Sequence, residues 1–139
     1  MDGLRLKWAI PVMAMILLCS TSLTTQVSPT TKKATRTRIT QGPELERTDS
    51  NFAIITWTTS NPGGSPEHYG VVYYGISPKE LSHTAKSPIR LNPGHSYTVF
   101  RVRMEDLKAG TTYYYKVDSI EANGNSDGVK SPVRHFTTR

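Results

Sequence analysis

The sequence predicts an all-β chain, folded as a seven-stranded antiparallel sandwich. Short segments rich in β-branched and aromatic residues recur at intervals of about 8 to 12 residues, and no helical periodicity separates them. Residues 107–117 (LKAGTTYYYKV) also join a leucine, a tight turn and a strand of alternating tyrosines. The spacing of Leu107, Gly110 and Tyr113 allows Tyr113 to fold back over the turn and hydrogen-bond to the backbone upstream, as at the corner of a sandwich domain.

The charge is concentrated at the N-terminus. Of the net charge of +6, residues 1–38 contribute +5, because they contain six Lys or Arg and one Asp. Residues 39–139 are therefore nearly neutral, at +1, and they are long enough for one sandwich domain. This domain matches no nucleic-acid-binding motif and has no obvious phosphate-tracking face, so nucleic acid is not expected as a partner.

Residues 1–22 have the pattern of a signal peptide. Basic residues precede the apolar run 8–18, which is too short to span a bilayer of ~30 Å at about 1.5 Å per residue. Ser20 and Ser22 offer a small-residue cleavage site. We therefore expect a protein that is secreted, or held at the cell surface or in the periplasm, with no stable membrane span after cleavage. An uncleaved anchor and a lipid on Cys19 are the alternatives.

Residues 23–38 are rich in Thr and basic residues and nearly free of large apolar side chains, which predicts a solvated linker. Contact with anionic lipid or cell wall is the alternative role for its basic cluster. Cys19 is the only cysteine, so the predicted domain, residues 39–139, has no disulfide and no thiolate metal site. The basic cluster consists of Lys32, Lys33, Arg36 and Arg38.

The first strand is expected near residue 39, where Gly42-Pro43 interrupts it, as suits an edge strand. Residues 52–59 are dense in β-branched and aromatic side chains and predict the second strand, with Trp57 at the centre of the core. The NPGG sequence at 61–64 ends this strand, because proline cannot continue a ladder and glycine permits positive φ.

Alternation predicts which side chains of the next strands enter the core. Residues 69–75 and 97–104 form two of these strands, and a small edge strand lies between them, within 77–94. After the corner, residues 113–117 form another. The side chains expected to face inward are those of Val72, Tyr74, Thr98, Phe100, Val102, Met104, Tyr113, Tyr115 and Val117, with Gly70 on the same face.

The last part of the chain supplies a loop and a closing strand. Residues 123–128 (NGNSDG) tolerate positive φ and predict a hairpin loop, and residues 133–138 follow with Phe136 inward. Seven such strands predict an immunoglobulin-like sandwich, whose core lies between two apolar inner faces.

Through Trp57, Leu107, Gly110 and Tyr113, the predicted domain resembles the fibronectin type III fold. It is more narrowly similar to the N-terminal domain of purple acid phosphatases. The resemblance implies a non-catalytic role, because in that family the chemistry belongs to a following metallophosphatase domain. The ligand motifs of that domain (D-x-G, G-D-x-x-Y, G-N-H-E, G-H-x-H) do not occur here, so no metal ligand carries over. The narrower similarity is carried by ITWTT at 55–59, VYYG at 72–75, FRVRMEDL at 100–107, TTYYYKV at 111–117 and FTT at 136–138.

No motif for catalysis or metal binding appears in the sequence. Residues 123–128 imitate the start of a calcium loop, but Arg134 stands where a bidentate Glu is required, so a hairpin turn explains them. A nucleophile elbow and a phosphate-binding loop are also missing, and we expect no catalytic residue, no metal and no cofactor. The four histidines lie on different predicted elements without ligand spacing, which predicts surface positions for His68, His83, His95 and His135.

Strand parity predicts an exposed strip of side chains as the candidate binding site. Tyr73, Tyr114 and His135 point outward from three strands that a fibronectin-type sandwich places side by side. With Lys116 at the edge they are expected to form one row, suited to stacking against sugar or another protein. Tyrosine also favours strands for structural reasons alone, which is the alternative explanation.

The sequence therefore predicts a non-catalytic extracellular module that binds a protein or polysaccharide or serves as a spacer. Two alternatives stay open. One is an accessory N-terminal domain of a purple-acid-phosphatase-like metallophosphoesterase whose catalytic domain lies outside this sequence. The other is a carbohydrate-binding module, which requires exposed aromatic rings.

Overall fold

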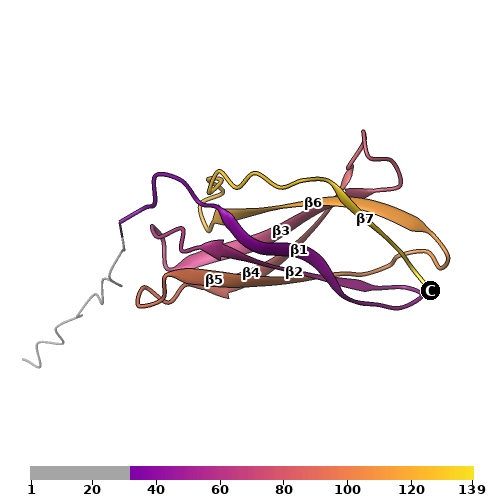
Figure 1. The fold of residues 1–139 in the computed structure, drawn as a ribbon, viewed down its shortest axis with the longest axis horizontal. Coiled ribbons are helices and arrows are strands. Elements are labelled where there is room, and N and C mark those ends of the chain that lie inside the picture. The colour runs from indigo at the N-terminus through magenta and orange to yellow at the C-terminus, as the bar shows by residue number, and fades with distance from the viewer. Residues whose placement is uncertain (1–31) are drawn as a thin grey trace, which may run out of the picture.

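The strands with alternating apolar and polar side chains form two antiparallel sheets, which pack face to face (Figure 1). A computed structural model describes residues 32–139. One sheet has the order β1-β2-β5 and the other the order β4-β3-β6-β7. The predicted all-β, immunoglobulin-like sandwich is confirmed. Its strands are β1 (Ile39–Thr48), β2 (Ala53–Ser60), β3 (Glu67–Gly75), β4 (His83–Arg90), β5 (Tyr97–Met104), β6 (Thr112–Glu121) and β7 (Arg134–Thr137).

The predicted signal peptide, residues 1–22 with Cys19, lies outside the described residues, and so does the linker up to residue 31. Within residues 32–139 there is no helix that could cross a membrane.

The core lies between the two sheets and is centred on Trp57, whose exposed fraction is 1%. Trp57 stacks on Phe100 of the neighbouring strand with ring centroids 5.3 Å apart. Gly70 of the facing sheet lies against both rings, and a Cβ at this position would come within 3.2 Å of the Trp57 side chain. The glycine therefore leaves the room that the indole occupies, and the predicted inward faces of β2, β3 and β5 are confirmed.

The first strand is irregular, as its Gly42-Pro43 sequence predicts. The peptide bond between these residues is cis, and the pairing of β1 with β2 shifts register on both sides of it. Gly42 has a φ of 77°, and a Cβ there would lie 2.9 Å from the Thr56 carbonyl oxygen. The irregularity is tolerated because β1 is an edge strand of its sheet.

The predicted corner is present between β5 and β6. The Tyr113 hydroxyl accepts a hydrogen bond of 2.9 Å from the Lys108 backbone N–H, five residues upstream. Gly110 adopts a φ of 58° in the turn, and Leu107 is buried beneath it. The Tyr113 ring stacks on Phe136 at 5.8 Å, so the corner is attached both to its own turn and to the core.

Replacing Tyr113 with phenylalanine is expected to lower the free energy of unfolding by about 0.5 to 1.5 kcal/mol, because one hydrogen bond is lost while the ring stays packed. Chemical denaturation of the two proteins measures the difference. An unchanged midpoint would show that the hydroxyl contributes nothing at the corner.

Candidate functional site

The four predicted binding residues all lie on the outer face of the four-stranded sheet. Tyr73 on β3 is opposite Lys116 on β6, and the Lys116 Nζ lies 5.7 Å from the centroid of the Tyr73 ring. Tyr114 on β6 is opposite His135 on β7, with ring centroids 5.8 Å apart. The structure therefore brings them together as two cross-strand pairs.

The prediction of one row is wrong. In the β3–β6 register Tyr114 is opposite Gly75, and Tyr73 lies two residues before Gly75 on β3. Residues offset by two on neighbouring strands are diagonal rather than adjacent, which separates the two pairs. Parity set the outward direction of these side chains, but the register between strands decided their alignment.

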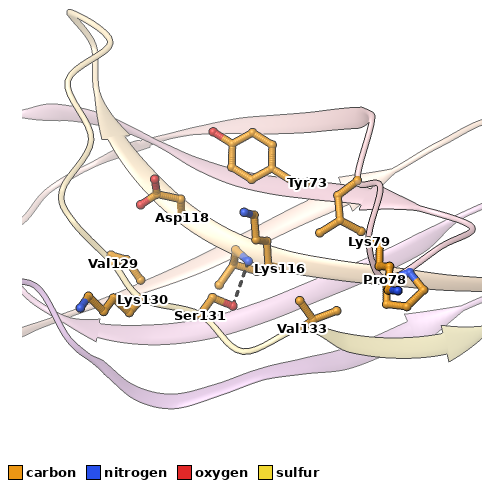
Figure 2. Close-up of a pocket in the computed structure, with 11 residues that line it drawn as sticks. Tyr73, Pro78, Lys79, Lys116, Asp118, Val129, Lys130, Ser131 and Val133 are labelled. Carbon is orange, nitrogen blue, oxygen red and sulfur yellow. Dashed lines mark hydrogen bonds between the residues drawn. The ribbon is translucent and has the colours of Figure 1, made fainter.

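A groove of about 650 Å³ lies beside the first of these pairs (Figure 2). Tyr73, Lys116 and Asp118 form its floor. One wall is the turn after β3, residues 78–81, and the other is the segment 129–133 that precedes β7. Tyr114 and His135 are not among the residues that line it. The groove is thus where part of the predicted binding site coincides with a concave surface.

The second wall is attached to β6 by side chains rather than by a regular ladder. The Val117 N–H donates a 3.0 Å hydrogen bond to Ser131 Oγ. The Ser126 hydroxyl donates to Asp118 Oδ2 at 2.9 Å, and Ile120 and Ser126 form an isolated bridge. Burial is the main cause that raises the pKa of Asp118. The predicted hairpin loop therefore continues as a segment that runs along β6 and borders the groove.

The lining of the groove is mixed in chemical character. Its lining contains no histidine or cysteine, and its serine, Ser131, already accepts a backbone hydrogen bond. Its one carboxylate, Asp118, accepts a hydrogen bond from Ser126. What the lining offers is an aromatic ring, ammonium groups and small apolar walls.

A cluster of buried polar side chains lies at the edge of the core, outside every site predicted from the sequence. His68 Nδ1 lies 2.8 Å from Asp127 Oδ2, and His68 Nε2 lies 3.1 Å from the Gly63 carbonyl oxygen. The Ser119 hydroxyl donates to the same Asp127 oxygen at 2.6 Å. The surface position predicted for His68 is wrong, because His68 shares the parity of Gly70 and points inward. Parity alone was a sufficient signal to find it.

Lys33 completes the buried cluster. Its Nζ donates to Glu121 Oε1 at 2.9 Å and also contacts Asp127 Oδ1. The Asp127 side chain is 0% exposed and that of Lys33 is 37% exposed. A Cβ on Gly64 would collide with Glu121, so this glycine makes the approach possible. The prediction that Lys33 belongs to a solvated linker is wrong.

Other residues of the predicted linker also contact the sandwich. The Ala34 N–H donates to the Pro62 carbonyl oxygen at 2.8 Å, and Thr37 is 2% exposed. A Cβ on Gly63 would collide with the Lys32 carbonyl group, so the backbone of this segment passes directly over the loop. Residues 32–38 are therefore packed on the domain rather than free of it.

The charges of the cluster compensate each other. Burial raises the pKa of Asp127, but hydrogen bonds from His68, Lys33 and Ser119 outweigh it and hold this pKa below its ordinary value. The hydrogen bond from Lys33 is the main cause that lowers the pKa of Glu121. Burial lowers the pKa of Lys33, but Asp127 and Glu121 raise it above its usual value. Each partner therefore favours the charged form of the other.

Three residues of the cluster could in principle hold a metal ion, because ligand atoms of His68, Glu121 and Asp127 lie within 4.8 Å of one another. The Lys33 ammonium already contacts both carboxylates, however, and supplies the positive charge that they require. The arrangement acts as an internal ion pair that attaches residues 32–38 to the loop before β3 and to β6.

We expect the stability of the protein to fall as the pH drops from 5 to 3. Carboxyl groups whose folded pKa is depressed contribute stability above their unfolded pKa, about 4, and lose it as the pH falls through the folded pKa. Lys33 is a cause of the low pKa of Asp127 and Glu121, so Lys33→Met should lose less stability over this range. Urea unfolding at several pH values measures both curves, and parallel curves would contradict this linkage.

The sequence of this chain matches the profile of one protein family. Residues 40–138 match the sequence profile described as "Purple acid Phosphatase, N-terminal domain". Comparison with curated proteins yields no match.

Two solved structures of the sensor domain of the anti-sigma factor RsgI4 from Pseudobacteroides cellulosolvens are similar to this chain. The longer form is 19% identical in sequence with a TM-score of 0.47, and the alignment covers 74% of this chain and 87% of that one. The shorter form shares 23% identity and a TM-score of 0.48, covering 81% and 96%. Similarity at this level does not bear on function.

Proposed function

Because this chain belongs to the family of purple acid phosphatase N-terminal domains, which are the non-catalytic part of those proteins, we propose that it is a binding module. It engages its partner on the outer face of the four-stranded sheet. The groove carries this proposal, because Tyr73 and Lys116, which strand parity places on the outer face, lie together on its floor. An aromatic ring beside a cation in a concave surface is a common element of recognition sites.

The two ends of the described chain lie at opposite ends of the sandwich, which suits a module that also acts as a spacer. The described chain enters at one end of the sandwich and Arg139 lies at the other end (Figure 1). Lys33 is bonded to the domain at the first end. At the second, the Thr138 N–H donates to the Thr111 carbonyl oxygen at 3.0 Å. Both ends of the described chain are therefore hydrogen-bonded to the sandwich itself.

We place the module outside the cytoplasm. This part of the proposal rests on the signal-peptide pattern of residues 1–22, and a domain without cysteine is compatible with it. A fold stabilised by its core and by a buried ion pair does not depend on the redox state of its compartment.

The family match supports a second candidate function, an accessory domain for a metallophosphoesterase. In that case the outer face would contact a catalytic domain instead of a separate ligand. The two candidates differ in whether the partner is part of the same protein.

The binding proposal is tested with the double substitution Tyr73→Ser and Tyr114→Ser. Binding to immobilised polygalacturonate and to peptide probes is measured by surface plasmon resonance. We expect at least a tenfold loss for the probe that binds, because large aromatic side chains account for much of the binding energy at such surfaces. Circular dichroism should stay unchanged.

The matched control is Tyr97→Ser, which removes an exposed tyrosine of β5, on the other sheet. This variant should bind as well as the unchanged protein. If the double variant keeps full affinity, the partner binds elsewhere, and the loops at the ends of the sandwich become the next surface to test.

A further inference from the structure

The lysines of the groove differ from two arginines on the other sheet. Lys79, Lys116 and Lys130 line the groove, and within residues 32–139 none of them forms an ion pair. On the three-stranded sheet, by contrast, Arg101 is paired with Glu46 at 2.8 Å, and Arg103 is paired with Glu105 at 2.9 Å. The positive charge of the groove is therefore left for a partner.

This charge continues beyond the groove. Lys130 also lines a smaller depression of about 200 Å³ together with Arg36 and Arg38, and neither arginine has an ion-pair partner among the described residues. A basic track thus runs from Lys79 across β6 to the segment before β1. The near-neutral net charge of residues 39–139 hides this local excess, because Asp118 is the only acidic residue among those that line the groove and the depression.

The groove contains one carboxylate, but that group is engaged by the protein. Asp118 accepts hydrogen bonds from the Ser126 hydroxyl and from the Ser119 N–H. Its role is to hold the wall of the groove, where three lysines outnumber it among the lining residues.

The apolar parts of the lining favour a polypeptide as the partner. Pro78 and Leu81 lie on one wall, and Val129 and Val133 on the other, with Val133 47% exposed. The two walls therefore offer separate apolar surfaces that side chains of a partner polypeptide can contact. The Tyr73 ring is half-buried, and the Lys116 Nζ lies 5.7 Å from its centroid, so a partner that approaches this ring also meets an ammonium group.

We propose that the basic track binds an extended acidic polypeptide segment in which carboxylates alternate with small apolar side chains. The carboxylates pair with the lysines and the apolar side chains contact the walls. This inference rests on the binding function proposed above and specifies the class of partner. Charge complementarity of this kind mainly sets specificity and the rate of association, so binding should weaken as salt is raised.

The test uses the full chain and a short fluorescent peptide that alternates glutamate and valine. Fluorescence anisotropy at low and high salt measures its affinity, and the same peptide with glutamine in place of glutamate is the matched probe. We expect the glutamate peptide to bind and the glutamine peptide to bind at least tenfold more weakly. Lys116→Glu with Lys130→Glu should weaken binding about tenfold, because two favourable contacts become repulsive.

The control protein carries the same change in net charge at exposed lysines outside the track, Lys86→Glu with Lys108→Glu. It should bind the glutamate peptide normally. Equal binding of the two peptides, or equal loss in both double variants, would overturn the inference.

Binding tests with other polyanions show whether this inference fails alone or together with the proposed function. If polygalacturonate or a single-stranded oligonucleotide binds and the glutamate peptide does not, the inference is overturned. The binding function then stands if that interaction is lost in the Tyr73→Ser, Tyr114→Ser variant. If none of the probes binds, both proposals fail.

Discussion

Replacing Trp57 with alanine is expected to lower the free energy of unfolding by about 3 to 5 kcal/mol, the usual cost of removing a large aromatic side chain from a packed core. Trp57 is 1% exposed, stacks on Phe100 and lies against Gly70 of the other sheet. Its removal leaves a cavity between the sheets that the strands cannot close, because their pairing holds the backbones in place. Urea or guanidinium denaturation measures the loss.

The matched control is Trp57→Phe. The indole Nε1 has no hydrogen-bond partner among the described residues, so this substitution removes volume but no hydrogen bond. It should cost distinctly less than alanine. A loss below about 1 kcal/mol for Trp57→Ala would mean that the residue does not contribute to the core as its burial implies.

Replacing Asp127 with alanine is expected to cost about 3 kcal/mol, toward the lower end of the range for breaking a buried ion pair. The substitution leaves His68 and Ser119 buried without their carboxylate partner. Lys33 also loses a partner, but its side chain is 37% exposed and can return to water, which moderates the cost.

A double-mutant cycle with Lys33→Met isolates the ion pair from the other contacts of Asp127. We expect the double variant to lose less stability than the sum of the two single losses, because each single variant already breaks the pair. Strict additivity would contradict the coupling between Lys33 and Asp127. A loss below about 1 kcal/mol for Asp127→Ala alone would contradict the structural role of the cluster.

Much of the fold could be predicted because its signals are local in the sequence. Alternation along β2 and β5 placed Trp57 and Phe100 in the core, since successive side chains of a strand point to opposite faces. The corner was equally local, because Tyr113 bonds to a backbone group only five residues away. Parity was a signal for His68 as well, although the residue type suggested the surface.

The candidate site could be predicted only in part. Parity identified Tyr73, Tyr114, Lys116 and His135 as outward residues of neighbouring strands, which the structure bears out in direction. The groove itself could not be predicted, because its two walls are more than forty residues apart and meet only across β6.

By itself, then, the sequence determined the fold class, the inward and outward faces of the strands and the corner, because each depends on residues that are neighbours along the chain. Only the tertiary structure decided the register that separates Tyr73 from Tyr114, the walls of the groove and the contact of Lys33 with Asp127. That contact joins residues 94 positions apart. A period of two carries no information about which distant segment comes to lie beside a strand, and that choice is made by the packing of the whole chain.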